Sequence, residues 1–372
     1  MARKASAPTG GSRRSPIAVG FLLSLASVAV VLATLVLLEA MIRLGAGDED
    51  AGRELEPMHV YSEAYGWTLR PGFRHTAPSR TIAVNGRGYR GREYGPARAP
   101  GALRVVMLGD SIAFGPGVDD RETFAHRLDA PAEGREVVNL SVMGYGTDQE
   151  LLKLQREGLA FGPDVVVLHF CLQNDLADNM LARSLYDGVH PKPYFTYDET
   201  ERLRLHDDHV RTTPARRAAL FLHANSHLYR RATLAARPAG GGGHWLDRME
   251  KALENIGRAT ELTLRIVGAM RRLAEDNGAR FVVVIHPDES AFLRQSRLTE
   301  KISRSPRLEG TTVIAMADAY RARDLRWEEF ALDSLGHLNP TGHRVVAEVL
   351  RVVLDGRRAE PRVSDIMSGT DP

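Results

Sequence analysis

The sequence predicts a doubly wound α/β domain, with helices on both faces of a parallel sheet, behind one membrane-spanning helix. Beyond residue 103, short runs of β-branched and apolar residues alternate with longer helical patterns. These runs lack polar alternation, which is typical of strands buried on both faces of a parallel sheet. Ahead of them, residues 17–38 form an uncharged segment of 22 residues.

Length and composition narrow the class of protein. A chain of 372 residues favours one globular domain of about 200 to 300 residues with appendages. Its 43% hydrophobic and 26% charged residues exclude disorder as the main state. A net charge of +2 gives no support for a nucleic-acid partner. Because Cys171 is the only cysteine, intrachain disulfides and multi-cysteine metal clusters are excluded.

The N-terminal segment predicts the compartment. As a helix, residues 17–38 would be about 33 Å long, which matches the ~30 Å hydrocarbon core of a bilayer. Basic residues precede the segment and acidic residues 48–50 follow it. The positive-inside rule therefore predicts a cytoplasmic N-terminus and an extracytoplasmic domain, either periplasmic or at the cell surface. The alternative is a cleaved secretory signal, whose apolar region is normally about 7 to 15 residues long.

The elements follow in chain order. Five buried strands are predicted, at 104–108, 136–141, 164–171, 280–286 and 311–317. A capping box at 147–150 opens a helix that runs to Leu159, and residues 245–277 read as one long amphipathic helix stopped by Gly278. Asn339 is a good N-cap and Pro340 a good first residue for a last helix.

The same patterns divide the chain. We expect a basic cytoplasmic tail at 1–16, the anchor at 17–38, and a linker with an N-terminal extension of short strands at 39–100. The α/β domain covers 101–356, and a tail at 357–372 follows. A polar stretch at about 176–243 interrupts the α/β rhythm and closes with a run of four glycines. It is either a substrate lid or a surface excursion.

Candidate catalytic residues follow the ends of predicted strands. Ser111 comes directly after the first strand, in Gly109-Asp110-Ser111, where a serine is exposed and backbone N–H groups can face an oxyanion. A capping serine in a strand-to-helix turn is the alternative. A serine nucleophile needs a base and a group that orients it. His337, in the loop before the last helix, and Asp333, four residues earlier, can supply both.

Two further residues can donate hydrogen bonds to a substrate oxygen. Gly144 has no side chain to block the approach of its N–H, and Asn174 follows the third strand. Each residue alone is equally explained by a turn.

Elsewhere, His286 and Asp288 resemble a partial metal site without a partner ligand, and His343 falls within the last helix, which favours a structural role.

In this order, Ser111, Gly144, Asn174 and His337 resemble the SGNH (GDSL) hydrolase superfamily, over roughly residues 104–354. The resemblance implies a three-layer α/β/α sandwich with a flavodoxin-like parallel sheet. It also implies a nucleophilic Ser111, a general base His337 and an orienting Asp333. The Ser111 N–H, the Gly144 N–H and the Asn174 side chain would form the oxyanion hole, with Asp110 and Asp175 in supporting positions. No metal or organic cofactor is implied.

The chain departs from the family pattern at two positions. Leu172 stands where the family usually has a glycine, two residues before the asparagine. Asp333 lies four residues before His337, where three is the common spacing. A bulge of one residue in the loop would absorb the difference. Otherwise the site would operate as a Ser111–His337 pair.

Together these features predict an extracytoplasmic, membrane-anchored serine esterase that hydrolyses O-acyl esters, O-acetyl esters above all. A carbohydrate or small-molecule acyl ester is the expected substrate, and the carbohydrate preference rests on compartment and family analogy. One alternative is an O-acyltransferase acting on a surface polysaccharide with the same residues. A second is a non-catalytic glycan-binding or assembly protein with a degenerate site. The oligomeric state is left open.

Overall fold

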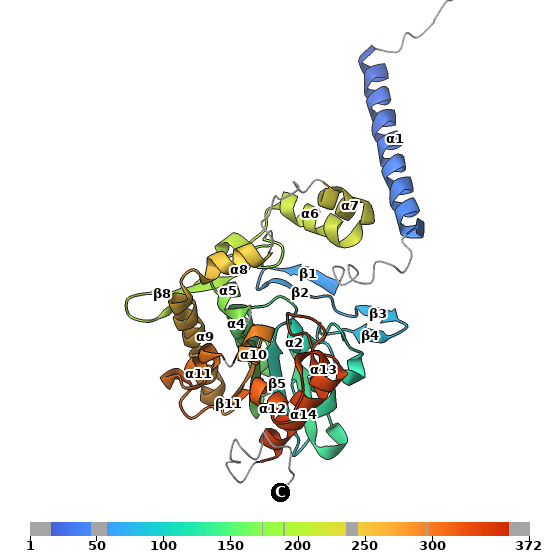
Figure 1. Ribbon diagram of the computed structural model, residues 1–372. Helices are drawn as coiled ribbons and strands as arrows, with labels where there is room; N and C mark the ends of the chain where they lie inside the picture. The colour runs from blue at the N-terminus through green and yellow to red at the C-terminus, as the bar shows by residue number, and fades with distance from the viewer. Residues whose placement is uncertain are drawn as a thin grey trace, which may run out of the picture.

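The computed structural model describes residues 16–45, 58–172, 174–188, 190–235, 245–294 and 296–356. The expected C-terminal tail at 357–372 and nearly all of the expected cytoplasmic tail lie outside these residues, as does the glycine run at 240–243. Figure 1 shows a sheet covered by helices, with one isolated long helix near the N-terminus.

The five predicted strands form one parallel sheet. They are β5 (Leu103–Gly109), β6 (Arg135–Asn139), β7 (Val165–Cys171), β10 (Arg280–His286) and β11 (Thr312–Ala315). Their order in the sheet is β11-β10-β7-β5-β6. The first strand along the chain thus lies between the second and the third, which is the flavodoxin-like order. The topological switch point, where ligands of such folds bind, lies between the carboxyl ends of β5 and β7.

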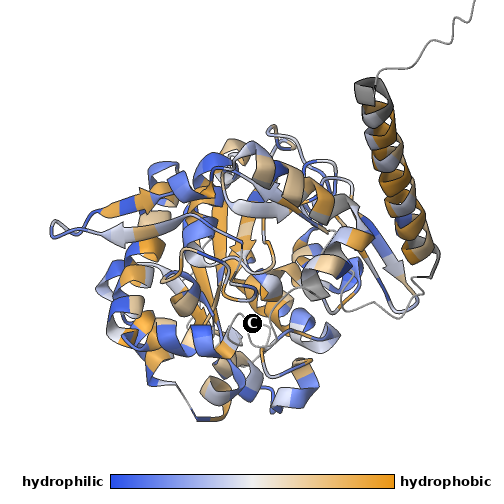
Figure 2. Cartoon of the chain, turned by 90° about the horizontal axis from the view of Figure 1, so that it is seen from above, coloured by the Kyte–Doolittle hydropathy of each residue, from blue (hydrophilic) through white to orange (hydrophobic). Residues whose placement is uncertain are grey.

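Helices cover both faces of this sheet, so the fold class expected from the sequence is confirmed. One face packs against α4 (Thr147–Arg156) and α9 (Ile256–Asp276), and the other packs against α3 (Phe124–Leu128), α12 (Met316–Arg321) and α14 (Pro340–Asp355). Alternate residues of each strand enter opposite cores, as strand geometry requires. Figure 2 shows the apolar strands between the two helical layers.

Two helix predictions need correction. The segment at 245–277 is two helices, α8 (Trp245–Leu253) and α9, because the Asn255 side chain accepts a hydrogen bond from the Arg258 N–H and starts a new helix. The helix that opens at Thr147 ends at Arg156, and a 3-10 turn, Gly158–Phe161, continues it. Its N-cap is Gly146 with Gln149 as the reciprocal partner, and Glu150 is buried instead of capping.

Short elements complete the fold around the sheet's carboxyl edge. Two hairpins make up the N-terminal extension, and a third hairpin with three helices makes up most of the insertion. The extension contains β1 (His59–Ser62), β2 (Gly66–Leu69), β3 (Arg74–Ala77) and β4 (Arg80–Ala83); the insertion contains α5 (Asp175–Asp178), β8 (Tyr194–Tyr197), β9 (Leu203–His206), α6 (Pro214–Asn225) and α7 (His227–Ala235); the remaining helices are α2 (Ser111–Phe114), α10 (Glu289–Arg294), α11 (Arg297–Ser303) and α13 (Trp327–Phe330).

The N-terminal helix α1 (Pro16–Gly45) is long and apolar enough to cross a membrane. Its apolar span covers the 23 residues Gly20–Ile42, which are not buried within the protein. Figure 2 shows that most residues along this helix are apolar.

Arg90, in the N-terminal extension, fixes the end of α2. Its side chain is buried and donates to the carbonyl oxygens of Phe114 and Val118 at 2.8 Å each, and also to that of Gly115. It forms an ion pair with Asp120 at 2.8 Å. Because Phe114 is the last residue of α2 and Ser111 the first, Arg90 holds the short helix that carries the candidate nucleophile.

A column of buried rings underlies the same edge of the sheet. His169 stacks on Phe124 at 5.3 Å between centroids, Phe124 contacts His343 at 5.4 Å, and His169 contacts His286 at 5.4 Å. Burial lowers the pKa of His169 and of His343 to about 3 each. Neither ring nitrogen of His169 has a hydrogen-bond partner within the described residues. These rings are therefore neutral at physiological pH, and they act as apolar core.

We predict that Arg90→Met lowers the free energy of unfolding by about 3 kcal/mol, because it removes the donor to several buried carbonyl oxygens at once. Arg90→Lys, which keeps a charged donor, should lose less. Urea unfolding followed by circular dichroism measures both. A methionine variant within about 0.5 kcal/mol of the wild-type protein would contradict this assignment.

We predict that His169→Phe removes part of the protein's acid sensitivity. The folded-state pKa of His169 is depressed to about 3, so below pH 6.5 the unfolded chain binds a proton that the folded chain does not. Stability is therefore lost as the pH falls from 6.5 toward 3, at about 1.4 kcal/mol per pH unit. Between pH 8 and pH 5 the variant should lose about 2 kcal/mol less than the wild-type protein. Equal losses in parallel urea titrations would argue against a neutral His169.

Candidate active site

Ser111 lies where the sequence predicts it, at the switch point of the sheet. It follows β5 directly and is the first residue of α2, with Asp110 as the N-cap. The Asp110 carboxylate accepts a hydrogen bond from the Ile112 N–H at 2.9 Å, which fixes the turn. Ser111 is 7% exposed, so only a small part of the residue reaches solvent.

His337 and Asp333 complete a continuous chain of hydrogen bonds to Ser111. The distance from His337 Nε2 to Ser111 Oγ is 2.9 Å, and that from His337 Nδ1 to Asp333 Oδ2 is 2.7 Å. The additional residue between Asp333 and His337 is absorbed by a tight turn. In this turn the Gly336 N–H donates to the Asp333 carbonyl at 3.1 Å, and Gly336 has a φ of +88°. A left-handed residue is sterically favourable only for glycine.

The His286 side chain hydrogen-bonds the backbone of this turn. Its Nε2 lies 3.0 Å from the Gly336 carbonyl oxygen, and a Cβ added at Gly336 would lie 2.9 Å from the same nitrogen. His286 is fully buried at the end of β10. The alternative role of His286 as a metal ligand is therefore disfavoured, because this ring nitrogen already binds the loop that carries His337.

The hydrogen bonds also define the tautomer of His337. Burial raises the pKa of Asp333, but the hydrogen bond and charge of His337 and the backbone N–H groups of His337 and Leu335 outweigh it, so the pKa lies below its ordinary value. Asp333 is therefore ionised at neutral pH and can only accept hydrogen bonds. Nδ1 of His337 must then carry the hydrogen, which leaves Nε2 free to accept the Ser111 proton.

The two predicted donors lie on neighbouring loops of the same edge. Gly144 follows β6 with a φ of +75°. Its loop is tied to the end of β5 by a 3.1 Å hydrogen bond from the Val142 N–H to the Gly109 carbonyl. Asn174 follows β7 and is buried, and its Nδ2 donates to Asp178 Oδ2 at 3.3 Å. This bond orients the Asn174 amide and leaves the second hydrogen on Nδ2 for another acceptor.

A cluster of buried carboxyl groups forms the floor beneath Asn174. Burial is the main cause that raises the pKa of Asp110, Glu150 and Asp175, and it raises that of Asp178 to about 7. Asp175 was expected here, and its Oδ2 accepts from the Cys171 N–H at 2.7 Å. Asp178 is therefore partly protonated at neutral pH, which lowers the negative charge near Asn174.

Sequence reasoning missed Glu150 and Asp178. Glu150 reads as the last residue of a surface capping box, and Asp178 lies in the polar stretch assigned to the insertion. Both are acidic residues of types that are mostly exposed in proteins. No local signal marks them as buried, because their burial depends on β7, α4 and the insertion coming together.

Aromatic rings form one wall beside Gly144. A Cβ added to Gly144 would lie 3.5 Å from the Tyr186 ring and 3.6 Å from the Trp67 ring. Tyr186 comes from the insertion, and its ring lies 6.1 Å from that of Trp245 in α8. Trp67 comes from β2 and donates from Nε1 to the Met143 carbonyl at 3.0 Å. The extension and the insertion thus both reach the loop that holds Gly144.

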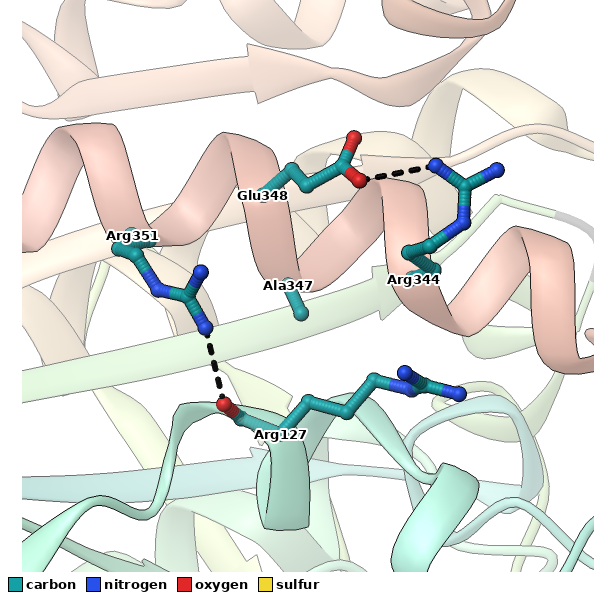
Figure 3. A pocket seen from close by; sticks show the side chains of 5 residues that line it. All are labelled: Arg127, Arg344, Ala347, Glu348 and Arg351. Carbon is teal, nitrogen blue, oxygen red and sulfur yellow. Dashed lines mark hydrogen bonds and ion pairs between the residues drawn. The ribbon is translucent and has the colours of Figure 1, made fainter.

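Within the described part of the chain, no three His, Cys, Asp or Glu side chains are arranged to hold a metal ion. A hollow of about 330 Å³ lies between α3 and α14, lined by Arg127, Arg344, Ala347, Glu348 and Arg351 (Figure 3). Arg344 pairs with Glu348 at 2.9 Å, and Arg351 donates to the Arg127 carbonyl at 3.1 Å. None of the five lining residues is a candidate catalytic or oxyanion-hole residue.

Several solved structures resemble the chain. One is a two-domain esterase active on acetylated mannans, with 13% identity and a TM-score of 0.39 over 73% of this chain and 52% of that one. The chain therefore spans about half of that esterase. An acetyl xylan esterase from Geobacillus stearothermophilus matches at 11% identity and a TM-score of 0.39, over 70% of this chain and 97% of that one. A putative acylhydrolase from Bacteroides fragilis matches at 12% identity and a TM-score of 0.35, over 69% of this chain and 89% of that one.

No curated protein matches the chain in sequence. The model of the GDSL-like lipase/acylhydrolase family, in contrast, matches residues 107–345. This range contains the parallel sheet from within β5 onward, together with Ser111, Asn174 and His337. The chain therefore belongs to the GDSL-like lipase/acylhydrolase family, and it is an ester-hydrolysing enzyme with the SGNH fold.

Proposed function

We propose that Ser111, His337 and Asp333 form a catalytic triad that hydrolyses O-acyl esters through a covalent acyl-enzyme. The observation that carries this proposal is the unbroken pair of hydrogen bonds, 2.9 Å from Ser111 Oγ to His337 Nε2 and 2.7 Å from His337 Nδ1 to Asp333 Oδ2. A site with a degenerate function would have no physical reason to keep all three groups in this geometry.

The geometry supports the following acylation step. His337 Nε2 takes the Ser111 proton while Ser111 Oγ attacks the ester carbonyl carbon. The ionised Asp333 stabilises the imidazolium that forms. The Ser111–acyl bond then persists as the carbon–oxygen bond to the alcohol breaks, and the alcohol leaves with the proton that His337 returns. In the second step His337 takes a proton from water, and the water oxygen attacks the acyl carbon. The bond to Ser111 Oγ then breaks, His337 returns the proton to Ser111, and the carboxylic acid is released.

The negative charge on the tetrahedral intermediate needs donors that are already oriented. We assign this role to the N–H groups of Ser111 and Gly144 and to Nδ2 of Asn174. Asp178 holds the Asn174 amide through one of its two Nδ2 hydrogens before substrate binds, so the other is already oriented when the charge develops. Asp110 and Asp175 act as supporting residues, through the turn at Ile112 and the end of β7 respectively.

The alcohol portion of the substrate is best assigned to carbohydrate. Tyr186, which is 37% exposed, offers a ring beside Gly144, and Trp245 lies next to Tyr186. The apolar faces of sugar rings pack on such aromatic surfaces. A small acyl group, acetyl in the simplest case, suits the buried position of Ser111. An acyltransferase would use the same residues and replace water with a sugar hydroxyl in the second step.

We further propose that α1 anchors the enzyme in a membrane with its catalytic domain outside the cytoplasm. The 23-residue apolar span supports the anchor. The basic residues before it and the acidic residues 48–50 after it support the orientation.

We predict that a fluorophosphonate probe labels the full-length protein at Ser111, and that His337→Ala abolishes the labelling because Ser111 then lacks its base. Mass spectrometry of the adduct identifies the residue.

Asp333→Asn should lower kcat for an acetyl ester by about 10³ to 10⁴, since the wrong histidine tautomer is then favoured. A folded protein that takes no label would refute the triad. Turnover measured with and without sugar acceptors separates hydrolysis from transfer.

We predict that Asn174→Ala lowers kcat by about 10² to 10³ and changes KM little, because its amide acts only on the charge of the transition state. Labelling at Ser111 should persist, since the nucleophile and its base are intact. Steady-state kinetics on an acetyl ester provide the test. A variant with wild-type kcat would remove Asn174 from the oxyanion hole while leaving the triad untouched.

A further inference from the structure

One charged side chain, Glu39, lies inside the apolar span of α1. The span covers Gly20–Ile42, and every other side chain in it is uncharged. A carboxylate within the hydrocarbon core is costly unless it has a partner. Glu39 is therefore expected to have a dedicated partner near the end of the span.

That partner is the N-terminus of α7, in the insertion. Glu39 Oε2 accepts hydrogen bonds from the Ser226 hydroxyl at 2.8 Å and from the Leu228 N–H at 2.9 Å, and Oε1 accepts one from the His227 N–H at 2.9 Å. The first N–H groups of a helix have no partner within the helix, and the helix dipole favours a negative charge there. Glu39 thus caps α7 from another segment of the chain, 187 residues away.

This contact sets the level of α7 relative to the bilayer. Glu39 lies three residues before the end of the span, which is about 4.5 Å along the helix axis. The first turn of α7 must therefore lie near the boundary between acyl chains and headgroups, the depth at which amphipathic helices bind membranes. Helix α6 precedes α7 directly, and the Ser226 N–H donates to the Leu222 carbonyl at 2.8 Å. Figure 1 shows both helices beside the end of α1.

The exposed residues of this hairpin fit a lipid surface. Phe221 is 67% exposed and Leu222 is 43% exposed, and both lie about one turn before Ser226. Arg217 and Arg231 are exposed on α6 and α7 respectively. Apolar side chains that enter the acyl region, beside arginines that meet lipid phosphates, are the features of a helix lying in the plane of a membrane interface.

We propose that the α6–α7 hairpin is a membrane-docking element that lies in the interface of a bilayer containing anionic phospholipid, held there by Glu39. This inference rests on the proposed membrane insertion of α1. Helix α6 contacts β1, and Tyr61 of β1 donates to the Val210 carbonyl at 2.8 Å. Since β1 pairs with β2, which carries Trp67, the hairpin connects the aromatic wall beside Gly144 to the membrane surface.

Spin labels on the full-length protein in phosphatidylglycerol-containing liposomes test this proposal. The native Cys171 is buried, so a label attaches at the introduced cysteine. Leu222→Cys reports on the hairpin, Leu32→Cys on α1, and Val352→Cys, near the end of α14, serves as an exposed control facing water. At each label we measure the collision rate with oxygen, which concentrates in lipid, and with a polar nickel complex, which stays in water. The ratio of the oxygen rate to the nickel rate at residue 222 should exceed the ratio at residue 352 severalfold and approach the ratio at residue 32.

Three results would overturn the proposal in distinguishable ways. A water-like ratio at 222 with a lipid-like ratio at 32 would show an inserted anchor without a docked hairpin. A water-like ratio at both positions would show that α1 itself does not insert. Protection of 222 from both collision agents would indicate a protein partner in place of lipid.

A second comparison tests the role of Glu39. Glu39→Gln keeps the size of the side chain but loses the charge and one acceptor, so the label at 222 should become more mobile and severalfold more accessible to nickel. Thr34→Gln introduces the same amide one turn or more away, where Thr34 bonds only within α1, and should leave the label unchanged. Equal effects of the two substitutions would refute the cap.

Discussion

The arrangement of five parallel strands, with β5 between β6 and β7, is the constraint on which the rest of the molecule depends. Parallel strands all end at one edge, so the loops after β5, β6 and β7 meet there although they are far apart in the chain. Ser111, Gly144 and Asn174 each belong to one of these loops. His337 reaches the same edge because its loop precedes α14, which packs on the sheet beside α3 and α12.

Buried polar groups give this edge its electrostatic character. Burial raises the pKa of Asp110 and Asp178 because it disfavours their ionised form, whereas Asp333, partly open to solvent and bonded to His337, has a lowered pKa and stays ionised. Carboxyl groups near the same site therefore have different roles. The buried ones accept hydrogen bonds that fix the site, and Asp333 supplies a negative charge beside His337. The column of neutral histidines under the loop at Gly336 adds rigidity without adding charge.

Segments outside the central sheet complete the site. Arg90, from the N-terminal extension, holds the end of α2, and Trp67, from the same extension, contacts the loop of Gly144. Tyr186 of the insertion lies beside the same loop, next to the Cβ position of Gly144. The extension lies before residues 107–345, which match the family model. The contact of Glu39 with α7 extends the same connection to the apolar helix.

The sequence by itself determined the parallel sheet, the start of α14 at Pro340 and the position of Ser111 after β5, because apolar periodicity and capping residues act over a few neighbouring residues. It also marked Gly144, Asn174, His337 and Asp333 as candidates. Only the tertiary structure decided that the turn at Gly336 brings Asp333 to His337, that Asn255 splits the helix expected at 245–277, and that Glu150 and Asp178 are buried. Arg90 and Glu39 likewise gained partners far along the chain. Burial and long-range hydrogen bonds depend on which segments the fold brings together, and no local pattern encodes them.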